Sequence, residues 1–194
     1  MSLLKNFKDD AIRNVKLMNS RGVPPAPGKY LVRVDGVTTL DGSGYTEKEG
    51  WVINYTVVKA LGSAPGLSKQ GHKGADCIFY NSKNKTMHIS FLKTFAAALM
   101  GLSETDIGKE ELLLVTGNDG EEDSCGIGAI LELDARESKQ TDQEGNPHVN
   151  VFWRSRNYYS DMSDSLLEEL TAYLGKSEVE SQLELESVLD EEAA

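Results

Sequence analysis

The sequence of 194 residues has few cysteines and few prolines, and it lacks any long apolar run. Because no stretch of about 18 apolar residues occurs, a transmembrane helix is excluded. Cys77 and Cys125 are not closely spaced, so a disulfide framework is not expected and a reducing compartment fits, while a single bridge between them stays open. The first ten residues mix lysines and aspartates with few apolar side chains, unlike a secretory signal. We therefore expect a soluble cytoplasmic protein.

Catalytic and cofactor motifs are also missing. The sequence contains neither the nucleophile pattern G-x-S-x-G nor a phosphate-binding P-loop. His72, His88 and His148 are too scattered relative to the cysteines for a recognisable zinc pattern, and the acidic run at 119–123 lacks the ligand spacing of an EF-hand. No spacing of the acids indicates a two-metal site. We expect a binding protein rather than an enzyme, with no cofactor and no metal.

The charge is distributed unevenly along the chain. Residues 1–103 carry 14 Lys and Arg against 7 Asp and Glu, whereas residues 104–123 carry 8 acids against Lys109. Residues 160–194 carry 11 acids against Lys176, so this tail accounts for nearly all of the net charge of −11. One interpretation is that the acids only keep the protein soluble. The other is that the tail competes for a cationic surface on its own body or binds basic partners.

Hydrophobic periodicity predicts a β-rich body followed by a helix. Alternating or β-branched segments predict five strands, at residues 29–35, 51–58, 75–80, 127–136 and 149–156. Apolar residues at helical spacing predict helices over 88–102 and 160–175, and an amphipathic one near 3–18. The segment 112–115 is compatible with either a strand or a helix. The last residues, 177–194, mix apolar residues with seven acids; of a packed helix and a disordered peptide that folds on a partner, we favour the second.

The order of three strands, a helix and two strands is that of the OB-fold, a five-stranded Greek-key barrel with its helix between strands three and four. Many small α+β domains share this order, but long loops between strands one and two and between the last two strands favour the OB-fold. We expect a mostly β barrel with helices at 29–159, with an acidic insert at 104–123. An N-terminal extension at 1–28 precedes it, and a C-terminal helix and acidic tail at 160–194 follow.

Several segments resemble phage-encoded single-stranded DNA-binding proteins of the OB type. They are the strand start Pro27-Gly28-Lys29-Tyr30, the strand from Trp51, the strand ending Phe79-Tyr80, the helix ending Leu99-Met100-Gly101-Leu102, the hairpin loop Glu144-Gly145-Asn146-Pro147 and the acidic C-terminus. The resemblance covers about residues 25–158 and the tail. It implies binding of single-stranded DNA in phage replication or recombination, inside a bacterial host cell. It also implies a tail that contacts replication or recombination proteins and, in related proteins, occupies the DNA groove. The insert at 104–123 departs from the family, because its charge would repel DNA in the groove.

Binding of a single strand needs cations for the phosphates and aromatic faces for the bases. The basic half of the chain offers Lys29, Arg33, Lys48, Lys59, Lys69, Lys73, Lys83 and Lys85. The aromatic candidates there are Trp51, Phe79 and Tyr80. We favour a core position for the face that carries Trp51, and we expect one of Phe79 and Tyr80, which point to opposite faces, to lie outside.

The last predicted strand offers a second platform. Val149, Val151 and Trp153 share one face, which we expect in the core, and the other face carries Phe152, Arg154 and Arg156. This second face predicts a site for base stacking and phosphate contact. The alternative is that Phe152 packs under a helix and the arginines form ordinary surface ion pairs.

The acidic tail is the predicted site for protein partners, through Glu184, Glu186, Asp190, Glu191 and Glu192. A rival hypothesis is a phage structural or adaptor protein whose barrel binds protein rather than nucleic acid. The sequence leaves the oligomeric state open.

Overall fold

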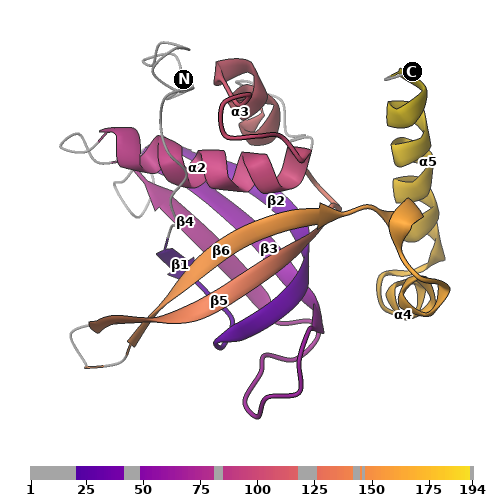
Figure 1. Cartoon of the computed structure of the whole chain (residues 1–194), viewed down its shortest axis with the longest axis horizontal. Coiled ribbons are helices and arrows are strands. Elements are labelled where there is room, and N and C mark those ends of the chain that lie inside the picture. Colours follow the sequence, from indigo (N-terminus) through magenta and orange to yellow (C-terminus); the bar gives the residue numbers. More distant parts are fainter. Residues whose placement is uncertain are drawn as a thin grey trace.

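The structure is a computed structural model that describes residues 21–41, 49–80, 85–117, 126–141, 145 and 147–192. The body is mostly β with helices, and a pair of helices follows it (Figure 1). Its strands are β1 (Arg21–Val23), β2 (Gly28–Asp41), β3 (Glu49–Ala60), β4 (Lys73–Phe79), β5 (Ile130–Thr141) and β6 (Pro147–Asn157). Its helices are α2 (Lys85–Met100), α3 (Lys109–Thr116), the 3-10 helix η2 (Tyr159–Asp161), α4 (Asp164–Leu174) and α5 (Lys176–Glu192).

The five predicted strands and the helix between the third and fourth are confirmed as β2, β3, β4, α2, β5 and β6. The segment whose structure was left open, 112–115, belongs to helix α3. Strand β1 was not predicted; it is a three-residue strand that pairs with the edge of β4. The predicted helix near 3–18 lies outside the described residues. No described helix combines the length and the apolar composition that a membrane crossing requires.

All strand pairs of the sheet are antiparallel, in the order β1-β4-β3-β2-β5-β6. Strands β2, β3 and β4 are consecutive neighbours, and β5 returns after α2 and α3 to lie on the other side of β2. Three consecutive strands with a fourth beside the first is the order of a Greek key. Strand β2 is central, because it pairs with β3 along most of its length and with β5 through its first part.

One face of the sheet packs against α2 and forms the main core. Trp153 of β6 is central to it, with its ring 5.5 Å from the ring of Tyr55 in β3 and 5.0 Å from that of Phe95 in α2. Nε1 of Trp153 donates a hydrogen bond to Oδ2 of the buried Asp76 in β4, at 2.8 Å. Strands β4 and β6 are separated by three strands in the ladder, so this bond shows that the sheet curls strongly. Helix α3 packs on the same side through Leu112 and Val115.

The opposite face of the sheet carries a second, smaller core. Leu31, Val58 and Ile130 of β2, β3 and β5 pack there against the C-terminal helices, which contribute Leu170 from α4 and Val179 from α5. In β2 the side chains of Leu31 and Val32 are therefore both buried, one in each core.

The interpretation of the tail as a disordered peptide is wrong. Residues 176–192 form helix α5, whose Val179 and Leu183 are one turn apart and pack into the second core. Glu180 and Glu184 are exposed on the outer side of α5, but the separation is incomplete, because Leu185 and Val188 are exposed as well and Glu186 is buried. Full burial of a Val or Leu side chain stabilises a fold by about 1.5–3 kcal/mol, which helps to order this helix.

Candidate nucleic-acid interface

The outer face of the β5–β6 pair presents Phe152 between two guanidinium groups. Val151 and Trp153 lie in the main core, so Phe152 between them points to the other face. The central carbon of the Arg136 guanidinium lies 4.9 Å from the centre of the Phe152 ring, and that of Arg154 lies 5.4 Å from it. Both distances are within the range of cation–π contact. We call Phe152, Arg136 and Arg154 the β6 platform.

Asp134 of β5 holds the two arginines in place. It lies directly opposite Phe152, and its side chain is only 6% exposed. Its Oδ2 accepts hydrogen bonds from Nε of Arg136 at 2.8 Å and from Nη2 of Arg154 at 3.1 Å. Burial opposes ionisation of this carboxyl, but the hydrogen bonds from Arg136 and Arg154 outweigh it, so the pKa of Asp134 is lowered. The carboxylate is therefore charged at neutral pH.

The arginines of the platform remain available to a ligand. Their side chains are 55% exposed for Arg136 and 42% for Arg154, so each guanidinium, with its five N–H donors, is accessible to a ligand beside its contact with Asp134. Lys29 of β2 lies opposite Asp134 on the same face and is exposed. Phe152, Asp134 and Lys29 thus form a row across β6, β5 and β2. The cations of Arg136 and Arg154 lie around the Phe152 ring, and Lys29 adds a third cation to the same face.

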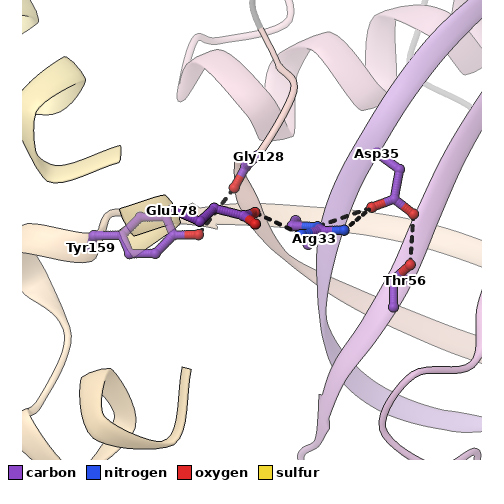
Figure 2. Close-up of polar contacts among 6 residues, drawn as sticks. All are labelled: Arg33, Asp35, Thr56, Gly128, Tyr159 and Glu178. Atoms are coloured by element: carbon purple, nitrogen blue, oxygen red, sulfur yellow. Dashed lines mark hydrogen bonds and ion pairs between the residues drawn. The ribbon is translucent and has the colours of Figure 1, made fainter. Parts of the chain in front are cut away.

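Farther along β2, the C-terminal helices cover the same face. Figure 2 shows Arg33 between Glu178 of α5 and Asp35 of β2. Nη1 of Arg33 donates to Oε1 of Glu178 at 2.6 Å, and Nε donates to Oδ1 of Asp35 at 3.0 Å. Burial lowers the pKa of Arg33, but hydrogen bonds to the two carboxylates outweigh it and raise that pKa. Lys59 of β3 forms an ion pair with Glu169 of α4.

Hydrogen bonds and an ion pair also connect the end of β6 to α5. Glu186 is 4% exposed, and its carboxylate accepts hydrogen bonds from the backbone N–H groups of Tyr159 at 3.0 Å and Ser160 at 3.1 Å. Its Oε1 lies 3.7 Å from Nη2 of Arg156. The hydroxyl of Tyr159 donates to the carbonyl oxygen of Gly128 at 3.2 Å (Figure 2). Burial and then the charge of Glu178 raise the pKa of Tyr159 to about 12.

The predicted face of β6 breaks at Arg156. A register shift between Leu131 and Leu133 places Arg156 opposite Leu131, whose side chain is in the main core. The alternation that would put Arg156 beside Phe152 is therefore interrupted by a β-bulge, which adds a residue on one strand. The Arg156 side chain is only 13% exposed, and its guanidinium stacks 4.7 Å from the ring centre of Tyr158.

The structure brings together some of the predicted residues and separates others. Lys29, Phe152 and Arg154 gather at the β6 platform, whereas Arg33, Lys59 and Arg156 lie against acids of α4 and α5. Trp51 is 1% exposed in the core, as the favoured interpretation of its face predicted, so it offers no ring to a ligand.

The other predicted DNA-binding and partner-binding residues lie away from the β6 platform or outside the described residues. Phe79 and Tyr80 are half-buried at the end of β4, where the ring of Tyr80 contacts His88 of α2. Lys69 and Lys73 are exposed near the start of β4. Lys48, Lys83 and the side chain of Lys85 lie outside the described residues, as do the side chains of Asp190, Glu191 and Glu192. Of the acids predicted to bind partners, Glu184 is exposed and Glu186 is buried.

The sequence did not identify Arg136 as part of the site. Its place beside Phe152 depends on the pairing of Arg136 with Asn150 across the β5–β6 loop. That loop is long, so its ends do not fix the register of the two strands. The sequence offered only an indirect signal for Arg136. The residue ends a predicted strand that forms a hairpin with the predicted strand of Phe152.

The described part of the acidic insert, 104–117, does not line the outer face. It includes α3 on the α2 side of the sheet, with Leu112 and Val115 in the main core. Within the described ranges, no group of three or more His, Cys, Asp and Glu residues is arranged to hold a metal ion. Comparison of the chain with protein-family models, with curated proteins and with solved structures finds no match.

Proposed function

We propose that this chain is a single-stranded DNA-binding protein that acts in phage DNA replication or recombination, in the cytoplasm of the bacterial host. The observation that carries the proposal is the β6 platform, an outward aromatic ring between two exposed guanidinium groups. On binding, Arg136 and Arg154 would turn from the ring of Phe152 toward phosphates, together with Lys29, and the ring would then stack on a base. Base–aromatic stacking contributes about 1–3 kcal/mol per base and tolerates any sequence.

The topology supports an OB-fold-like barrel as the scaffold. The Greek-key order β5-β2-β3-β4, with α2 following β4, is what such a barrel requires. The bond between Trp153 of β6 and Asp76 of β4 brings together the two strands that would close it. OB-folds bind extended strands between the loop after the first strand and the last hairpin, and here the platform lies on that hairpin.

The C-terminal helices would restrict this binding. Glu178 and Glu169 engage Arg33 and Lys59 on the face that carries the platform, so DNA phosphates and these carboxylates would compete for the same cations. The outward side of α5 presents Leu185, Val188 and Glu184, which are exposed. An apolar pair among acids fits a basic protein with an apolar groove, so this side of α5 would bind replication or recombination proteins.

Fluorescence anisotropy with a labelled oligothymidine at low salt tests the proposal. Deletion of the tail would uncover Leu31 and Val58, so the C-terminal helices are better tested by Glu169→Gln combined with Glu178→Gln. We expect micromolar or tighter binding by the native chain and tighter binding by this double variant. Absence of micromolar binding by both proteins would refute the proposal.

A matched pair of charge reversals localises the site. Arg154→Glu and Lys176→Glu change the net charge equally, but Lys176 is an exposed residue at the start of α5 whose contact is an ion pair with Glu180. We expect R154E to weaken binding at least tenfold and K176E to change it less than twofold. Equal losses would mean that only the overall charge matters.

The alternative function is a phage structural or adaptor protein, and the exposed Leu185 and Val188 of α5 favour it. A protein of this kind would form a defined multimer and have no affinity for DNA. Light scattering beside the oligonucleotide titration separates the two functions.

A further inference from the structure

A hollow of about 310 Å3 lies between the C-terminal half of α2 and the end of β6. Its α2 side is made of small residues, among them Ala97, Ala98 and Gly101. Its β6 side carries Arg154, Arg156 and Tyr158, and none of the residues that line it is acidic. An aromatic residue and arginines beside a small open space are the chemistry that binds an unpaired base and its phosphate.

Gly101 marks the end of α2 beside the hollow. It has a φ of +66° and donates its N–H to the carbonyl oxygen of Ala97 at 3.0 Å, a left-handed helix end that favours glycine. A Cβ atom built on Gly101 would lie 4.0 Å from the hydroxyl oxygen of Tyr158, so the end of α2 and Tyr158 face each other across the hollow.

Arg156 has unused hydrogen-bonding capacity at this place. Its Nη2 is 3.7 Å from Glu186, but its buried Nε has no hydrogen-bond partner among the described residues. Buried donors are nearly always paired in proteins. A small rotation of the guanidinium toward a phosphate or a base oxygen would provide the missing partner.

The hollow adjoins the strand that carries the β6 platform. Arg154 is common to both, because its guanidinium lies over Phe152 and the residue is among those that line the hollow. Tyr158 follows Phe152 by six positions, which is about 20 Å at the rise of a strand. Because an OB-fold binds about 4–16 nucleotides, one bound strand is long enough to reach both places.

We propose that the hollow between α2 and β6 holds one nucleotide of the bound single strand, separate from the base that stacks on Phe152. This inference rests on the proposed function and adds to it a second position for a base. The strand would pass along β6 at Arg154, with a base entering between Gly101 and Tyr158. The hollow would be occupied only when the strand is unpaired, because a paired base cannot leave the duplex without disruption.

The test is Ala97→Leu, which fills the hollow with a larger side chain, against Ala172→Leu, which makes the same change on the exposed side of α4. Both substitutions keep a good helix former, so the helices should persist. Loss of one bound base should weaken the affinity of A97L for an oligothymidine of 15 nucleotides about 5- to 100-fold. The A172L variant should remain within twofold of the native chain.

A second measurement does not depend on how A97L folds. Titration of the native chain with thymidine 5′-monophosphate, followed by amide NMR, should shift the signals of Gly101 and Ser155. Shifts confined to the surroundings of Phe152, or native affinity in a folded A97L, would overturn the inference and leave the proposed function intact. If the native chain does not bind the oligonucleotide at all, the proposed function fails first. A peptide strand as the true occupant of the hollow would leave DNA affinity unchanged in A97L, which also counts against the inference.

Discussion

Replacement of Glu186 by alanine should weaken the docking of α5 on the body and thereby lower stability while raising affinity for DNA. The carboxylate of Glu186 accepts backbone hydrogen bonds from Tyr159 and Ser160 and lies beside Arg156, all at the point where β6 ends. Alanine removes these acceptors together. The helix that carries Glu178 would then be held mainly by Val179 and Leu183 in the second core.

The expected loss of stability depends on what happens to the two N–H groups that donate to Glu186. Hydrogen bonds to a charged group contribute about 1.5–3 kcal/mol each. Ser160 is exposed, so its N–H regains water in the variant, whereas Tyr159 is buried and its N–H is left without an acceptor. We therefore expect a loss of about 2–4 kcal/mol, which for a chain of this size lowers the melting temperature by about 4–16 °C.

The matched control is Glu184→Ala, two residues away on the exposed side of α5. A surface substitution of this kind should change stability by less than about 0.5 kcal/mol. Thermal melting followed by circular dichroism measures both variants. Hydrogen exchange of the α5 amides should accelerate in E186A and remain native in E184A.

The same substitution should raise the affinity for DNA although it lowers stability. Whenever α5 detaches from the sheet, Glu178 no longer pairs with Arg33, and the proposed DNA surface gains a free cation. We expect E186A to bind oligothymidine more tightly at a temperature where it is folded. A variant that melts within 1 °C of the native chain, or that loses both stability and affinity, would refute this role of Glu186.

The other predictions concern the β6 platform and Cys77. Arg154→Gln should reduce the slope of log K against log salt by about 0.7, the value for one phosphate contact on a single strand, in anisotropy titrations from low to high salt. Phe152→Leu keeps an apolar side chain without the aromatic face and should weaken binding by about 1–3 kcal/mol in the same assay. Because the pKa of Asp134 is lowered, its contribution to stability should be complete above about pH 5 and lost as the pH falls through the folded-state pKa. Denaturant unfolding should therefore show a difference between the native chain and Asp134→Asn that is constant above pH 5 and shrinks in acid. Burial, and then the charge of Asp76, raise the pKa of Cys77, so its thiol should react with a thiol reagent more slowly at pH 7.5 than free cysteine does.

Local periodicity predicted the elements of the body because each strand buries one face. The alternation in β3, with Trp51, Ile53 and Tyr55 all buried, is visible in the sequence as a run of apolar residues two apart. The period of α2 is visible for the same reason. The five strands and the central helix therefore lie where the pattern places them, within three residues at most ends, but β2 and β5 extend six and five residues beyond their predicted ends.

The site depends on features that periodicity does not contain. The bulge between Trp153 and Arg156 turns Arg156 toward the core side, and nothing in the local sequence marks it. Arg136 joins Phe152 through a register that the long β5–β6 loop leaves open. The tail was misjudged because its acids suggested disorder, while Val179 and Leu183 supply the apolar stripe that docks α5.

The acidic tail and the basic first half of the chain, which are separate in the sequence, form ion pairs in the folded structure. Acids from the tail meet cations from the body at Glu178 and Arg33, at Glu169 and Lys59, and at Glu186 and Arg156. Three of the predicted DNA contacts are thus paired with acids of the C-terminal helices, while Arg136 and Arg154 share Asp134 of β5 and Lys29 lies opposite it. A net charge of −11 therefore says little about the surface that a DNA strand would meet first. If this face binds DNA as proposed, phosphates compete with the tail carboxylates, and its affinity should follow the docking of α4 and α5 more closely than the total charge.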